Sequence, residues 1–167
     1  MTFKIRAGER FIPCVLSRMQ DDEPTSRIDR MPRVMSLDGI REDILANVVM
    51  LLNSRSRPND EDLSRYPEIE NSVISYGLMD FCGMNCNMEN LETIRKHVRD
   101  QLIKFEPRID KESLQINVFE SSDSTERCSF SMEIIGRFAI SEMTGDFRYS
   151  TRFDLETGQV TMINKDM

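Results

Sequence analysis

The side chains best suited to hold a metal ion are four cysteines and a single histidine. Cys82 and Cys86 form the one close pair, Cys14 and Cys128 lie far from it in sequence, and His97 is the only imidazole. A structural zinc site needs four ligands, which usually come as two close pairs. Because the second pair is missing, we expect no metal site, reduced cysteines and a structural role for His97.

Nucleophilic catalysis and phosphate binding also lack their usual motifs. A Ser or Cys nucleophile needs a nearby base, for which only His97 is available in the usual form, and no Gly-x-Ser-x-Gly elbow occurs. The glycines are scattered and no Gly-Lys-Ser/Thr step occurs, so we expect no cofactor. A catalytic carboxylate pair stays an open alternative, because a sequence does not show the separation that glycoside hydrolysis requires.

The charged motif that stands out is Phe105-Glu106-Pro107-Arg108-Ile109, where two apolar residues bracket a Glu-Pro-Arg step. Glu106 follows a predicted helix, whose negative dipole end disfavours a lone carboxylate. A cation should therefore neutralise it, either Arg108 locally or Arg55 or Arg57 from another helix end. The motif is either a helix stop with a surface ion pair or a rigid, charged corner that a partner protein binds.

Three helices are predicted to position these residues. Apolar side chains recur at helical spacing over residues 9–20, 36–53 and 90–105. Ser36 is the expected cap of the second helix, and Asn87 or Asn90 that of the third. Between the second and third helices the sequence predicts short turns packed on the core, followed by a loop over 80–88. The residues that indicate these turns are Tyr66, Pro67, Ile69, Val73, Ile74, Tyr76 and Gly77.

Beyond Pro107 the period of the apolar residues changes from helical to two. Alternation over 114–118, 128–134, 147–153 and 160–163 predicts strands, with a hairpin turn at Thr157-Gly158. The sequence therefore predicts an α+β fold in which N-terminal helices pack on a C-terminal antiparallel sheet.

Two parts of the chain differ in charge and composition. Residues 1–35 are predicted to be an amphipathic helix with a flexible linker, and 36–167 a folded domain. The first helix, with Phe11 and Leu16 on its apolar face, either folds onto the domain or docks into a partner groove. Residues 1–57 carry a net charge of +2 and residues 58–167 a net charge of −9. We expect the front part to reach an acidic or apolar groove, and the body to face basic partner surfaces.

The overall charge of −7 argues against nucleic-acid binding, which needs clustered Lys and Arg. No apolar run reaches the roughly 18 residues that a membrane span needs. The first residues also lack the apolar run of a signal peptide. We therefore expect a cytoplasmic protein without direct membrane insertion.

Three segments resemble the TssE-type baseplate subunit of type VI secretion systems. This is the small-wedge family shared with contractile phage tails, and it is sometimes labelled lysozyme-like. The segments are Leu51-Leu52-Asn53-Ser54-Arg55, then Ser72-Val73-Ile74-Ser75-Tyr76-Gly77-Leu78 with Asp80, and finally Phe105-Glu106-Pro107-Arg108-Ile109.

The resemblance implies a non-enzymatic subunit with a sheath-domain-like fold in a membrane-docked baseplate. Its implied partners are other wedge proteins and sheath proteins, whose polymerisation it helps to start. Glu106, Pro107 and Arg108 are implied to bind a wedge partner, and Arg55 is a further candidate. The alternatives are a peptidoglycan hydrolase, which the lysozyme-like label suggests, and an unrelated cytosolic scaffold.

Overall fold

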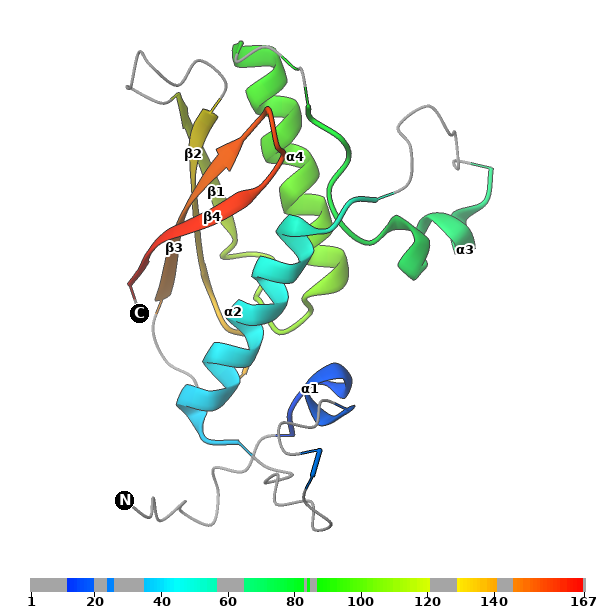
Figure 1. Ribbon diagram of the computed structural model, residues 1–167, viewed down its shortest axis with the longest axis vertical. Coiled ribbons are helices and arrows are strands. Elements are labelled where there is room, and N and C mark those ends of the chain that lie inside the picture. The colour runs from blue at the N-terminus through cyan, green and yellow to red at the C-terminus, as the bar shows by residue number, and fades with distance from the viewer. Residues whose placement is uncertain are drawn as a thin grey trace. The chain divides into compact units, whose positions relative to one another are not determined.

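The computed structural model describes residues 12–19, 24–25, 35–56, 65–82, 84, 87–120, 129–140 and 146–166. The helices are α1 (Val15–Met19), α2 (Leu37–Asn53), α3 (Pro67–Glu70) and α4 (Met88–Phe105), with a 3₁₀ turn η1 (Val73–Ser75). The strands are β1 (Gln115–Glu120), β2 (Ser129–Arg137), β3 (Asp146–Asp154) and β4 (Val160–Asp166). Helices precede strands along the chain, which confirms the predicted α+β class (Figure 1).

Two compact units divide the chain, residues 1–47 and residues 48–167. The first unit holds α1 and most of α2, and the second holds the end of α2, α3, η1, α4 and the sheet. The predicted division between residues 35 and 36 stays a prediction, since residues 26–34 lie outside the described part of the chain.

The two long helices start and end where their capping residues predict. The Ser36 hydroxyl accepts a hydrogen bond from the Gly39 amide (3.2 Å) at the start of α2. Asn87 caps α4, because its Oδ1 accepts from the Asn90 amide at 2.8 Å. The last residue of α2, Asn53, uses its side-chain amide to bond both the N–H (3.0 Å) and the C=O (3.1 Å) of Val160. This contact fixes the end of α2 to the start of β4.

The sheet has the order β1-β2-β3-β4 with every neighbouring pair antiparallel. Its alternating residues form the buried face that the sequence predicts, namely Ile116, Phe130, Met132, Ile134, Phe147, Tyr149, Thr151, Phe153 and Val160. Phe130 lies opposite Phe153 in the register, and their rings stack at 4.9 Å. α4 lies against β1 and buries Leu91, Ile94, Val98, Gln101 and Leu102. Each fully buried large apolar side chain stabilises the fold by roughly 1.5–3 kcal/mol.

Two short elements differ from their predictions. Tyr66, Ile69, Val73 and Ile74, expected in turns packed on the core, are exposed on α3 and η1 and next to them. Helix α1 begins at Val15, later than the predicted start at residue 9, because Pro13 disfavours a helical conformation at Ile12. Residues 9–11 and 20 of that predicted helix lie outside the described part.

Candidate partner interface

The Glu-Pro-Arg corner begins where α4 ends. The backbone amide of Glu106 donates the last bond of the helix to the Leu102 carbonyl at 2.9 Å. Pro107 follows, has no N–H to continue the helix, and is exposed. The chain then turns back, so that the amide of Ile109 donates to the Glu106 carbonyl at 3.1 Å. The corner is thus a tight, internally bonded turn with its proline outward.

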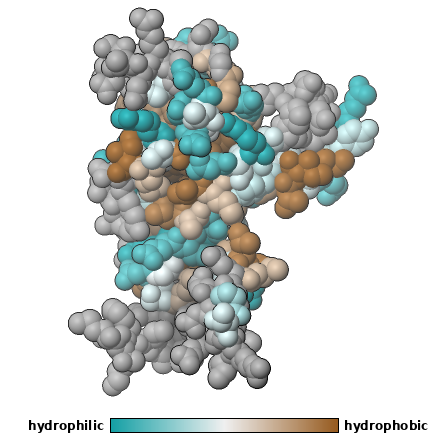
Figure 2. All heavy atoms as spheres, viewed as in Figure 1, coloured by the Kyte–Doolittle hydropathy of each residue, from teal (hydrophilic) through white to brown (hydrophobic). Residues whose placement is uncertain are grey.

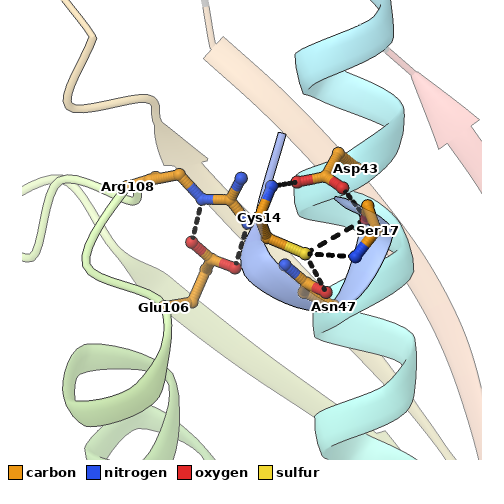
Figure 3. A network of polar contacts seen from close by, with 6 residues as sticks. All are labelled: Cys14, Ser17, Asp43, Asn47, Glu106 and Arg108. Carbon is orange, nitrogen blue, oxygen red and sulfur yellow. Dashed lines mark hydrogen bonds and ion pairs between the residues drawn. The ribbon is translucent and has the colours of Figure 1, made fainter. Parts of the chain in front are cut away.

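Glu106 and Arg108 form a two-pronged ion pair inside this turn (Figure 3). Arg108 Nε lies 2.7 Å from Oε1 of Glu106, and Nη2 lies 2.9 Å from Oε2. The Glu106 side chain is only 4% exposed, whereas that of Arg108 is 23% exposed. Of the cations proposed for Glu106, the local one is therefore its partner. Burial and the negative charge of Glu106 together raise the pKa of the neighbouring Tyr76 phenol.

The corner is also tied to the end of β2. The Ala139 amide donates to the Arg108 carbonyl at 2.7 Å, and the Asp110 amide donates to the Arg137 carbonyl at 2.9 Å. Between these bonds, Ile109 pairs with Phe138 in an antiparallel bridge, and both side chains are buried. A helix end, a tight turn and a strand end therefore hold the ion pair in one geometry.

The three segments that carry the resemblance meet around this corner. The Leu78 amide donates to the Ser54 carbonyl at 2.8 Å, which joins the second segment to the first. The rings of Tyr76 and Phe105 meet edge to face at 5.2 Å, which joins the second segment to the third. Gly77 has a φ of 104°, and a Cβ there would lie 2.5 Å from the Ser54 carbonyl oxygen. Only glycine allows this close approach.

Arg55 does not lie beside Glu106, where the sequence analysis considered placing it. Its Nη2 donates to the Thr157 carbonyl at 3.4 Å and approaches Cys82 Sγ at 3.7 Å. It therefore borders the β3–β4 turn instead of neutralising Glu106. Arg57 lies outside the described residues. Arg55 is exposed, and its role as a partner residue stays a prediction.

Helix α1 contacts α2 through polar groups within the first unit (Figure 3). The Cys14 amide donates to Asp43 Oδ2 at 3.4 Å, and the Ser17 hydroxyl donates to Asp43 Oδ1. Cys14 Sγ lies 3.9 Å from Asn47 Oδ1. Leu16 remains exposed, as do the other apolar side chains of this segment, Ile12, Val15 and Met19. Phe11, the other candidate on this helix, lies outside the described residues.

No role for Asp43 was predicted from the sequence. Asp43 is buried, and it lies next to Ile44 and one turn from Ile40 on the apolar stripe of α2. A buried carboxylate needs hydrogen-bond donors. Its position on that stripe was the available signal that another segment contacts it.

The residues considered for catalysis or metal binding make contacts that belong to the fold itself. His97 Nε2 accepts from the Met79 amide at 3.1 Å, and burial lowers its pKa. The hydrogen bond to Asp80 is the main cause that raises the pKa of the Cys82 thiol, which disfavours the reactive thiolate. Within the described ranges no three His, Cys, Asp or Glu side chains gather as metal ligands; Cys86 and Cys128 lie outside them. Among the helices of those ranges, none has the length and apolar character to cross a membrane.

Comparison with known proteins gives one family. A family model described as baseplate wedge protein gp25 matches residues 38–141. This range includes α2 from Asp38 onward, α3, η1, α4 and the whole Glu-Pro-Arg corner. No curated protein matches the chain.

Proposed function

Because the chain belongs to the family of baseplate wedge protein gp25, we propose that it is a wedge subunit of a type VI secretion apparatus. Membership of this family supports a structural role in the baseplate of a contractile system. The finer proposal assigns Glu106, Pro107 and Arg108 to the contact with another wedge protein. It places the subunit in the cytoplasm, in a baseplate docked at the membrane.

The buried Glu106–Arg108 pair is the observation that carries this assignment. A corner fixed by α4 and β2 loses little conformational freedom when a partner binds it. Pro107 is exposed at its tip, and the Arg108 side chain is 23% exposed. The corner thus offers a rigid apolar ring beside a cation of fixed orientation.

The outer strands support the proposed contact with sheath proteins. β1 and β4 each pair with one neighbouring strand of the described sheet and form its two edges. Backbone groups along a sheet edge can pair with a strand from another chain. We propose that a sheath strand adds at one of these edges, which would help sheath polymerisation to start.

We propose that the subunit has no enzymatic activity. A general acid must hold a proton where a leaving group can receive it. Both carboxylate oxygens of Glu106 instead accept hydrogen bonds from Arg108. We expect purified protein to leave peptidoglycan uncut; cleavage that disappears in Glu106→Gln would support the hydrolase alternative.

The wedge assignment is tested by co-expression with the baseplate subunits encoded beside this chain, followed by size-exclusion chromatography. The informative variant is Pro107→Glu, which changes the exposed tip and retains the buried ion pair. We expect it to weaken wedge binding about tenfold or more while it still folds. Glu92→Lys, on an exposed part of α4, is the matched control. Equal binding by Pro107→Glu and wild type would contradict the interface, and absence of any wild-type complex would contradict the function.

A further inference from the structure

The two edges of the described sheet differ in what occupies their backbone groups. Along an antiparallel strand, the N–H and C=O of one residue point to one neighbouring strand, and those of the next residue point to the other. The outward groups of an edge strand therefore recur at every second residue. Whether these groups are free or bonded decides where another chain can pair.

Asn53, the last residue of α2, occupies the first outward position of β4. Its Oδ1 accepts from the Val160 amide at 3.0 Å, and its Nδ2 donates to the Val160 carbonyl at 3.1 Å. A neighbouring strand would make the same two bonds to one residue of β4. Nδ2 also donates to the Val49 carbonyl at 3.0 Å, which fixes the amide on its own helix. The end of α2 therefore takes the place of a strand at this point of the edge.

Arg55 extends this contact to the turn that leads into β4. Its Nη2 donates to the Thr157 carbonyl at 3.4 Å. The same guanidinium fills the space that a Cβ on Gly158 would need, and Gly158 has a φ of 65°. Asn53 and Arg55 thus hold both the turn and the first residue of β4 against the end of α2.

The β4 edge is also irregular farther along the strand. Thr151 of β3 pairs with Met162. The preceding Ser150 pairs with Asn164, so Ile163 has no opposite residue in β3. A bulge of this kind interrupts the two-residue repeat of the outward groups. Bulges and covering groups are two ways in which sheet edges avoid pairing with other chains.

β1, in contrast, has a regular edge. Its six residues pair with β2 without a register shift. Because Val160 points away from β3 and the direction alternates across each pair, the register places the outward groups of β1 at residues 116, 118 and 120. Among the described residues, the backbone bonds of turns and loops include none to β1. An extended segment can therefore pair with this edge at regular spacing.

The side chains of β1 indicate the chemistry of such a segment. Phe119 is 53% exposed, and Val118, which points to the other face of the sheet, is half-buried. Aromatic and β-branched residues form favourable cross-strand pairs with apolar residues. Exposed apolar side chains also gather on α3 and η1 (Figure 2), but these elements lie outside the sheet and do not distinguish its edges.

We propose that Asn53 closes the β4 edge, so that an extended strand of a sheath protein adds at β1. This inference rests on the proposed function and decides which of the two edges takes part. The added strand bonds the outward groups of Ile116 and Val118 and places an apolar side chain beside Phe119. Asn53 determines the choice of edge, because it occupies the position at which a strand would begin to pair with β4.

The first test is amide hydrogen exchange of the full wild-type chain, with and without the purified sheath protein encoded beside it. The amides of Ile116 and Val118 should exchange at least about tenfold more slowly in the mixture, and that of Met162 should not change. Protection of Met162 without protection of Val118 would overturn the choice of edge.

Two proline variants form a matched pair for the binding assay. Val118→Pro and Met162→Pro each remove one outward N–H and leave the bonds within the sheet in place. We expect Val118→Pro to weaken sheath binding about tenfold or more, and Met162→Pro to bind as wild type does. The opposite result would make β4 the acceptor, and wild-type binding by both variants would exclude strand addition at either edge.

Asn53→Ala tests the closure itself. The Val160 amide should exchange at least about tenfold faster in this variant, whereas the amide of Thr161, which points toward β3, should stay protected. In Asn53→Ala alone, we expect added sheath protein to protect the Met162 amide as well. If Met162 stays unprotected, Asn53 is not the residue that closes this edge.

Other outcomes separate this inference from the proposed function. If the wild-type chain binds the wedge subunits but not the sheath protein, the strand contact fails and the wedge assignment stands. If the chain binds none of them, both fail together. If residues 116 and 118 become protected in the concentrated chain alone and sheath protein adds nothing, the occupant of β1 is a second copy of this chain.

Discussion

Removing Arg108 should destabilise the fold strongly, although the residue lies in a turn near the surface. Arg108→Ala leaves the Glu106 carboxylate, whose side chain is 4% exposed, without both charge-assisted bonds at 2.7 Å and 2.9 Å. Breaking a buried pair by removing one partner costs about 3–5 kcal/mol. Because the Arg108 side chain is itself 23% exposed, we expect the lower end, about 3 kcal/mol.

The measurement is urea and thermal unfolding of wild type and variant, monitored by circular dichroism. For a chain of this size, a loss of 1 kcal/mol lowers Tm by about 2–4 °C, so Arg108→Ala should melt about 6–12 °C lower. The control is Arg95→Ala, which removes an exposed ion pair with Glu92 on α4 and should leave Tm nearly unchanged.

A double variant separates the burial of charge from the loss of packing. Glu106→Gln/Arg108→Gln removes both charges, so neither group is left as a buried, unpaired ion. We expect it to unfold at a higher temperature than Arg108→Ala, because an unpaired charge costs more than a neutral amide pair. If Arg108→Ala costs no more than Arg95→Ala, the pair is not protected from solvent, and the rigid corner loses its physical basis.

Four further outcomes are expected. Gly77→Ala should cost about 2 kcal/mol or more in urea unfolding, because φ is 104° and the Ser54 backbone blocks a Cβ, and an unchanged midpoint would contradict that geometry. Gly158→Ala should cost less, since the blocking group there is the flexible end of a side chain. The pKa of His97 is lowered by burial, so its contribution to stability is complete above the unfolded value near 6.5 and is lost as the pH falls through the folded value. Urea midpoints of His97→Gln should therefore fall less than those of wild type between pH 7.5 and 5.5, and parallel slopes would exclude this effect. Deletion of residues 1–35 should weaken wedge binding and change its salt dependence if this part reaches a partner, as titrations at two salt concentrations would show; identical affinity and salt slope would exclude the contact.

The sequence by itself determined the long helices, the strands and the ion pair between Glu106 and Arg108. Apolar periodicity gave α2, α4 and the four alternating strands, because each element buries one face and the period of that face depends on local geometry alone. The match of Glu106 with Arg108 was also accessible, since a cation two residues away reaches a carboxylate at a helix end without help from the rest of the fold.

Only the tertiary structure decided which residues from distant segments meet. The pairing of Ser54 with Leu78 directs Arg55 to the β3–β4 turn, a contact between residues about a hundred positions apart that no local spacing encodes. The same holds for Asp43, whose partners are Ser17 of α1 and Cys14 directly before α1. Val73 and Ile74 look like core residues in the sequence and are exposed, because burial depends on which elements cover a segment and not on its own hydrophobicity.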